Sequence, residues 1–258
     1  MITVSNIEKS YGGKTVLANV SVQFPARKIT SLIGPNGAGK TTLLMLIARL
    51  LAPTQGSIAL GERDIAAIRL QDYAKLVATL RQSPDFHLRL TVDELVAFGR
   101  FPYSRGALTA QDRLAIDEAI DFLSLGSLRA CYLDELSGGQ RQMAFLAMTI
   151  AQQTDLLLLD EPLNNLDMKH AVQIMRALRR LCDEQGRTVI LVIHDINFAA
   201  NYSDHIVAMQ HGAVRYSGPV AEVVTEQRLC ELYDIDFEIV RSDRGCVCNY
   251  FTPPGEST

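Results

Sequence analysis

Two glycine-rich turns carry the residue types most suited to chemistry. The first, GPNGAGKTT, follows the apolar run ITSLI and fits the spacing G-x-x-x-x-G-K-[ST]. Glycines let backbone N–H groups close around phosphate oxygens, an ammonium can bridge the β- and γ-phosphates of a nucleotide, and a hydroxyl can hold Mg²⁺. A flexible glycine loop alone would not explain a lysine and a threonine at those positions. The predicted phosphate site comprises Gly34, Pro35, Asn36, Gly37, Ala38, Gly39, Lys40, Thr41 and Thr42.

The second glycine turn, LSGGQRQM at residues 136–143, has a simpler reading. Ser137 followed three residues later by Gln140 forms a capping box, in which each side chain satisfies a backbone N–H at the start of a helix. Taken alone, the turn predicts only that a helix begins here. Whether its glycines do more depends on the rest of the chain.

Carboxylates stand at the end of another apolar run, LLLLDE. A phosphate loop needs a second ligand source for its metal, so Asp160 is expected to hold Mg²⁺ and Glu161 to act as the general base on the attacking water. Asp160 alone could also be a turn former before Pro162. His194 follows the apolar run TVILVI, and two readings stay open: a structural histidine, or a group that reaches the γ-phosphate and positions the water.

The elements that must position these residues follow from hydrophobic patterning. ITVSNIEKSY and TVLANVSVQF flank Gly12 and Gly13, which suggests an N-terminal antiparallel β layer. ITSLI, LVATL, LLLLD and TVILVI are continuous apolar runs, as expected for parallel strands covered on both faces. The fold class is therefore α/β, a mostly parallel nucleotide-binding core.

The interval 83–155 has helical periodicity in three stretches and is too long for a simple crossover. It is interpreted as a helical subdomain inserted in the core. DHIVAMQHGAVRYSG and FEIVRSDRGCVCNYF each read as a β-hairpin. No internal repeat or linker interrupts the chain, so residues 1–258 are expected to form a single domain.

Composition narrows the function classes. The 258 residues are 48% hydrophobic, with a formal net charge of −4, which gives no electrostatic footprint for nucleic acid. Five cysteines and a start without a secretion-signal pattern indicate a reducing, cytoplasmic setting. The longest apolar stretch, LLMLIARLLA, contains Arg49 and falls short of the roughly 20 residues of a membrane span. Any role at a membrane would need a separate anchor.

The order of these motifs resembles that of the ATP-binding cassette (ABC) ATPases over essentially the whole chain, and LSGGQ is the most specific element. The resemblance implies that Tyr11 stacks on adenine, that Gln82 touches Mg²⁺ and senses a transport subunit, that Asp167 crosses a dimer interface, and that His194 is the switch histidine. Two places depart from the usual pattern: Arg81, and the two asparagines in EPLNNLD. Neither removes a catalytic group, so they bear on loop stiffness.

The resemblance further implies a homodimer that sandwiches two ATP molecules, each with Mg²⁺. The glycine turn at residues 136–143 is the signature turn of this family. In one copy its residues Ser137, Gly138, Gly139 and Gln140 would then contact the ATP held by the other copy. The chain looks like the iron-siderophore uptake branch, which implies permease subunits, an extracytoplasmic siderophore-binding protein and a peripheral place on the cytoplasmic face of the membrane.

Other readings remain open. Haem, cobalamin or another metal chelate is the alternative cargo. A non-transport ABC ATPase would be expected to carry a coiled-coil insertion, tandem cassettes or a basic surface. A small-molecule P-loop kinase would leave LSGGQ unexplained.

Overall fold

The computed structural model describes residues 1–81, 89–243 and 245–251. The chain divides into two compact units, a first unit of Met1–Glu62 with Val192–Thr258 and a second unit of Arg63–Leu191. Each is described by itself. Whether the chain acts as a single domain with an insertion over 83–155 stays a prediction.

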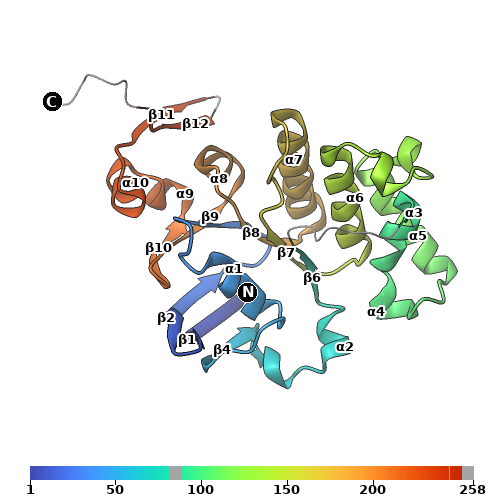
Figure 1. The fold of residues 1–258 in the computed structure, drawn as a ribbon, viewed down its shortest axis with the longest axis horizontal. Coiled ribbons are helices and arrows are strands. Elements are labelled where there is room, and N and C mark those ends of the chain that lie inside the picture. The colour runs from blue at the N-terminus through green and yellow to red at the C-terminus, as the bar shows by residue number, and fades with distance from the viewer. Residues whose placement is uncertain (82–88, 244, 252–258) are drawn as a thin grey trace. The chain divides into compact units, whose positions relative to one another are not determined.

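The first unit contains the predicted N-terminal antiparallel layer. β1 (Ile2–Tyr11) pairs antiparallel with both β2 (Lys14–Phe24) and β4 (Gln55–Leu60). Alternate apolar side chains on these strands are buried, as a sheet covered on one face requires. The layer is visible below the label N in Figure 1.

The parallel part of the first unit begins at β3 (Ile29–Ile33), which is buried at every position. β9 (His205–Gln210) runs parallel to β3, and β10 (Ala213–Pro219) returns antiparallel to β9. His211 and Gly212 make the turn with φ values of +51° and +78°, the left-handed pair of a type I′ hairpin. The other elements of this unit are α1 (Lys40–Ile47), α8 (Ile196–Tyr202), α9 (Val220–Val223), α10 (Glu226–Tyr233), β11 (Glu238–Ser242) and β12 (Gly245–Asn249).

In its described residues, the second unit contains four strands, of which the last ends one residue beyond the unit, and most of the helical residues. β6 (Val77–Leu80) and β7 (Leu156–Asp160) are parallel, and β7 lies between β6 and β8 (Thr188–Val192) in the strand order. Every residue of β7 is buried, in keeping with its unbroken apolar sequence. The remaining strand and the shortest helices are β5 (Arg63–Asp64), α2 (Leu70–Tyr73), and the 3₁₀ turns Ile65–Ala67, Gly126–Leu128 and Leu133–Glu135.

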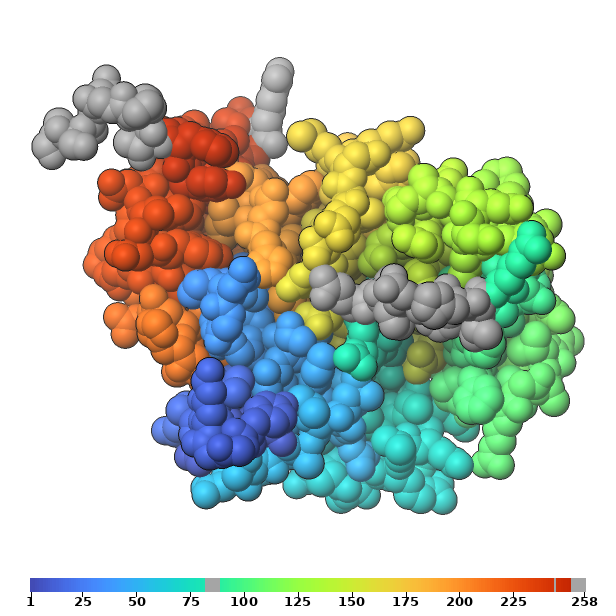
Figure 2. Space-filling view, in the orientation of Figure 1, coloured from blue at the N-terminus to red at the C-terminus, as the bar shows by residue number. Residues whose placement is uncertain are grey.

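The three predicted helices between β6 and β7 are present. They are α3 (Val92–Phe98), α5 (Ala110–Phe122) and α6 (Gly138–Ala151), with α4 (Phe101–Ser104) after α3 and α7 (Met168–Gln185) after β7. α3 and α5 both pack against α6. Residues of this helical region give the green part of the face shown in Figure 2. In the described part of the chain, no helix combines the length and apolarity that a membrane crossing demands.

Candidate nucleotide site

The phosphate loop begins where β3 ends, and its first residue can only be glycine. Gly34 has φ +134°, and a Cβ there would lie 2.0 Å from the backbone oxygen of Met209 on β9. No side chain fits such a separation, so the loop leaves the sheet edge in close contact with backbone. Gly39, with φ +95°, is the N-cap of α1 and brings no side chain to the helix start.

Lys40 is held against this loop. Only 5% of the residue is exposed, and its Nζ donates to the carbonyl oxygens of Gly34 at 2.7 Å and Pro35 at 3.0 Å. These hydrogen bonds hold the ammonium close to the backbone of the loop, and a positive charge in that place suits a site whose ligand is an anion. The loop N–H groups and the positive end of α1 add to this preference. The geometry of the loop is therefore suited to a phosphate group.

A contact that the motifs did not indicate fixes the start of the loop. The Gly34 N–H donates to the hydroxyl oxygen of Tyr233, on α10, over a distance of 3.1 Å. Burial raises the pKa of Tyr233 to about 12, so the phenol stays neutral and protonated at physiological pH. Tyr233 stands near the other end of the chain, and no local pattern could have marked it.

Two further predicted residues belong to the first unit. Tyr11 ends β1 with 46% of its surface exposed, and the Lys9 ammonium lies 4.9 Å from its ring centroid. An exposed ring at a strand end is available for stacking. His194 follows β8 and is exposed. Its neighbour Asp195 caps α8, accepting from Asn197 N–H at 2.8 Å and from the next amide at 3.2 Å.

The second unit holds both predicted carboxylates. Asp160 is the last residue of β7 and is 7% exposed. Glu161 has φ +51°, a left-handed conformation that is uncommon for a residue with a side chain and recurs at functional sites. Its Oε2 accepts a hydrogen bond of 3.1 Å from the Asn164 amide. The sharp turn after β7 thus presents the Glu161 side chain in a defined direction.

The glycine turn at 136–143 has the predicted capping box. Ser137 Oγ accepts from Gln140 N–H at 3.3 Å, and Gln140 Oε1 accepts from Ser137 N–H at 3.0 Å. Gly139 is buried beneath His170, and a Cβ there would lie 2.3 Å from the imidazole ring. The capping reading is therefore confirmed, and the second glycine serves a close packing contact.

Asp167, the N-cap of α7, is tied to the same histidine. Its Oδ1 accepts from both the His170 N–H and the His170 ring at 2.8 Å. The hydrogen bond from the His170 backbone N–H, and to a smaller extent the one from its ring, lowers the pKa of the Asp167 carboxyl below its usual value. His170, which sequence reasoning missed, connects the signature turn to Asp167.

The predicted site residues are thus divided between the units. The first unit brings the loop 34–42, Tyr11 and His194, and the second brings Asp160, Glu161, the turn 136–143 and Asp167. Gln82 lies outside the described residues.

A phosphate loop at the end of a buried strand, strand-end carboxylates and a helix that opens on a second glycine turn define an ATP-binding cassette. The chain belongs to the ABC transporter family, which it matches over residues 17–164. Its fold is that of a P-loop ABC ATPase, as expected, and it is an ATPase.

Similar proteins whose names state what they import indicate the branch of the family that the chain resembles. The chain is 48% identical to the petrobactin import ATP-binding protein YclP of Bacillus subtilis, over 98% of this chain and 100% of the relative. It is 41% identical to the iron(3+)-hydroxamate import ATP-binding protein FhuC of the same organism, over 91% and 88% of the two chains. Among solved structures, a dimeric post-hydrolysis state of the ATP-binding cassette MJ0796, bound to ADP and Pi, shares 28% identity with a TM-score of 0.75, covering 85% of this chain and 99% of that one.

Proposed function

We propose that this chain is the ATP-hydrolysing subunit of an importer for ferric siderophores. The observation that carries the ATP-binding part is the loop 34–42 with its buried lysine. The cargo part rests on near full-length similarity to relatives named for the import of petrobactin and of iron(3+)-hydroxamate. Because no residue of such a subunit need touch the chelate, haem, cobalamin or another metal chelate remains the alternative cargo.

On this proposal, ATP binds with its phosphates in the loop 34–42 and its adenine against the exposed ring of Tyr11. The Thr41 hydroxyl and the Asp160 carboxylate would hold Mg²⁺, and Gln82 would join them. Magnesium would neutralise charge on the phosphates. These ligands are the hard oxygen donors that Mg²⁺ prefers, which supports the assignment.

Glu161 is assigned as the general base. It accepts a proton from water as the water oxygen bonds to the γ-phosphorus and the bond to the β-phosphate oxygen breaks, releasing ADP and phosphate. His194 would orient that water. The left-handed backbone of Glu161 supports a functional role, because such strain persists where a side chain must keep one direction.

We assign the signature turn to the ATP held by a second copy of the chain. The amides at the start of α6 and the positive end of its dipole suit a phosphate, and the turn residues Ser137, Gly138, Gly139 and Gln140 would face it. Asp167, 64% exposed and capping α7, would cross the same interface. The dimeric state of MJ0796 supports this arrangement. ATP would then join two subunits, and its hydrolysis would release them.

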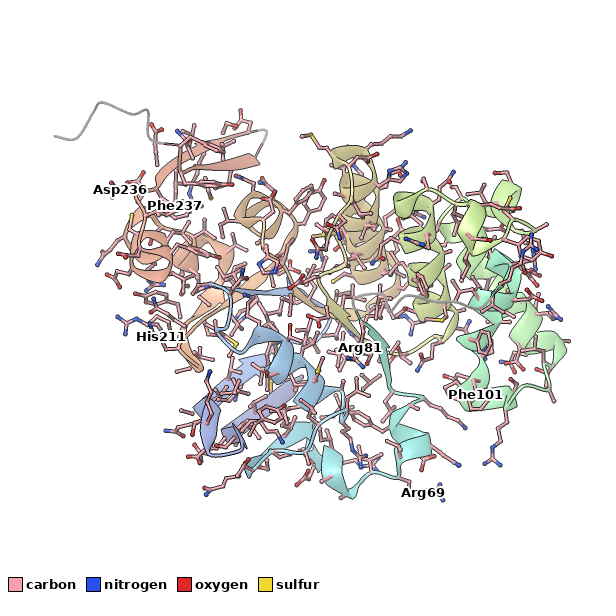
Figure 3. All side chains as sticks on the ribbon, in the orientation of Figure 1. Arg69, Arg81, Phe101, His211, Asp236 and Phe237 are labelled. Atoms are coloured by element: carbon pink, nitrogen blue, oxygen red, sulfur yellow. The ribbon has the colours of Figure 1, made fainter. Side chains whose placement is uncertain are left out.

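A groove in the second unit is the proposed docking place for the permease. It has a volume of about 390 Å³ and a largely apolar lining from α3, α4 and the start of α5. Phe98 and Phe101 remain 52% and 59% exposed beside it, and Figure 3 labels Phe101 on α4. Large exposed aromatic side chains at a groove are typical of protein contacts. The subunit would therefore sit peripherally on the cytoplasmic face of the membrane, with an extracytoplasmic siderophore-binding protein delivering cargo from the other side.

Two substitutions test the ATPase assignment. Lys40→Ala should abolish ATP binding in isothermal titration, and unchanged affinity would refute the phosphate site. Glu161→Gln should bind ATP but not hydrolyse it, so an ATP-bound homodimer should accumulate in size-exclusion chromatography. A monomer at saturating ATP would contradict the dimer proposal.

The cargo is tested separately. Cells lacking the chain should fail to take up ⁵⁵Fe-labelled petrobactin or a ferric hydroxamate, and the wild-type chain should restore uptake where the Lys40→Ala variant does not. Normal uptake of both chelates with loss of haem or cobalamin uptake would replace the cargo assignment and leave the ATPase intact.

A further inference from the structure

The turn after β7 constrains Glu161 more closely than a strand end requires. Glu161 holds φ +51°, and the residue after it is the buried Pro162. The backbone N–H of Asn164 donates to the Glu161 carbonyl over 3.1 Å, closing a four-residue turn with proline in its second position. The turn thus begins at a glutamate whose left-handed φ is uncommon for a residue with a side chain.

The same asparagine also holds the side chain. Its Nδ2 donates to Glu161 Oε2 over 3.1 Å, so Asn164 contacts both the backbone and the carboxylate of the residue assigned as base. A side-chain amide can donate a hydrogen bond to a carboxylate and does not itself take up or release a proton. A hydrogen bond to an ionised acceptor is among the stronger kinds.

We propose that Asn164 is a positioning residue for hydrolysis: its amide fixes the direction of the Glu161 carboxylate, and its backbone N–H fixes the turn that presents it. The inference rests on the assignment of Glu161 as the base. Asn164 itself need not touch ATP. Without the Asn164 donor the carboxylate would spend less time aligned with the water, so kcat should fall while ATP affinity stays unchanged.

The test measures ATP hydrolysis by variants of the full-length chain in the presence of ATP and Mg²⁺. The variants separate the loss of the hydrogen-bond donor from a change in side-chain shape and from the effect of a neighbouring residue. Asn164→Ala removes the donor, and Asn164→Asp keeps the shape but offers only acceptors beside a carboxylate. Both should lower kcat by about tenfold to a hundredfold, with KM changed by less than about twofold. Asn164→Ser restores a hydroxyl donor and should recover part of the loss. Asn165→Gly is the matched control, because it removes the next amide at a position whose φ of +58° glycine accepts.

Three results would overturn the proposal: a kcat of Asn164→Ala within about twofold of the wild type, equal losses for Asn164→Ala and Asn165→Gly, or full activity of Asn164→Asp. Glu161→Gln is measured in parallel. If Glu161→Gln hydrolyses ATP normally, the base assignment itself is wrong. If Glu161→Gln is inactive while Asn164→Ala is fully active, only the positioning role fails. ATP-dependent dimerisation should survive in every Asn164 variant, because the turn 136–143 is untouched.

Discussion

Arg100 and Asp112 form a buried ion pair, and removing one partner should destabilise the second unit strongly. The pair is 2.9 Å apart, with 3% and 4% of the two side chains exposed. Arg100 Nη1 also donates to the Ala151 carbonyl over 2.7 Å and to Gln153 over 3.1 Å. One guanidinium thus connects the residue before α4, the start of α5 and the end of α6.

The size of the effect follows from what Arg100→Met leaves behind. Asp112 would stay buried and keep its hydrogen bonds from Thr109 but lose the cation, and the Ala151 carbonyl would lose a partner. Breaking a buried pair from one side costs about 3–5 kcal/mol. At about 2–4 °C per kcal/mol for a chain of this size, Tm should fall by about 6–20 °C.

Thermal and urea unfolding of three variants checks this reasoning. The double variant Arg100→Met with Asp112→Asn removes the stranded charge and should be more stable than Arg100→Met alone. Arg69→Ala is the surface control: Arg69 bonds Asp72 at 2.7 Å but is 86% exposed, and Figure 3 labels it on the second unit, so no measurable loss is expected. A loss below about 1 kcal/mol for Arg100→Met, or a double variant no better than the single one, would refute the argument.

Three shorter predictions follow from single contacts. Gly139→Ala places a methyl carbon 2.3 Å from an imidazole ring, so it should abolish ATP-dependent dimerisation in sizing experiments, and an unchanged dimer would contradict this. Tyr233→Phe leaves a phosphate-loop N–H without its acceptor and should cost about 1–3 kcal/mol in urea unfolding; an unchanged midpoint would dismiss that contact. The N–H and hydroxyl of Thr109 lower the pKa of Asp112, so this carboxylate stabilises the fold above the unfolded pKa of about 3.9 and the gain disappears as pH falls through the lower folded pKa. Asp112→Asn should therefore flatten the acid limb of the stability curve, and superimposable curves would contradict this.

Much of the site could be predicted because its signals are local in sequence. The loop 34–42 is defined by glycines, a lysine and a threonine at set spacing, and the structure places them where a buried strand meets a helix. The Ser137 and Gln140 capping box spans three residues, so the start of α6 was predictable to within a residue or two. The unbroken apolar sequence of β7 indicated a strand buried on both faces, which is what the structure has.

The rest required the tertiary structure, because its contacts join distant residues or depend on backbone angles. Tyr233 reaches Gly34 across 199 positions, and nothing in the sequence around either residue marks the pair. In the sequence, the asparagines of EPLNNLD are only a departure from the usual family pattern. The structure shows that the side-chain amide of the first asparagine, Asn164, donates a hydrogen bond to Glu161, a residue with a left-handed φ. The sequence alone determined which groups could bind and hydrolyse ATP, because the motifs consist of particular residue types at set spacings along the chain. Only the fold decided which neighbours hold those groups in place, because burial and close approach are properties of the packed chain.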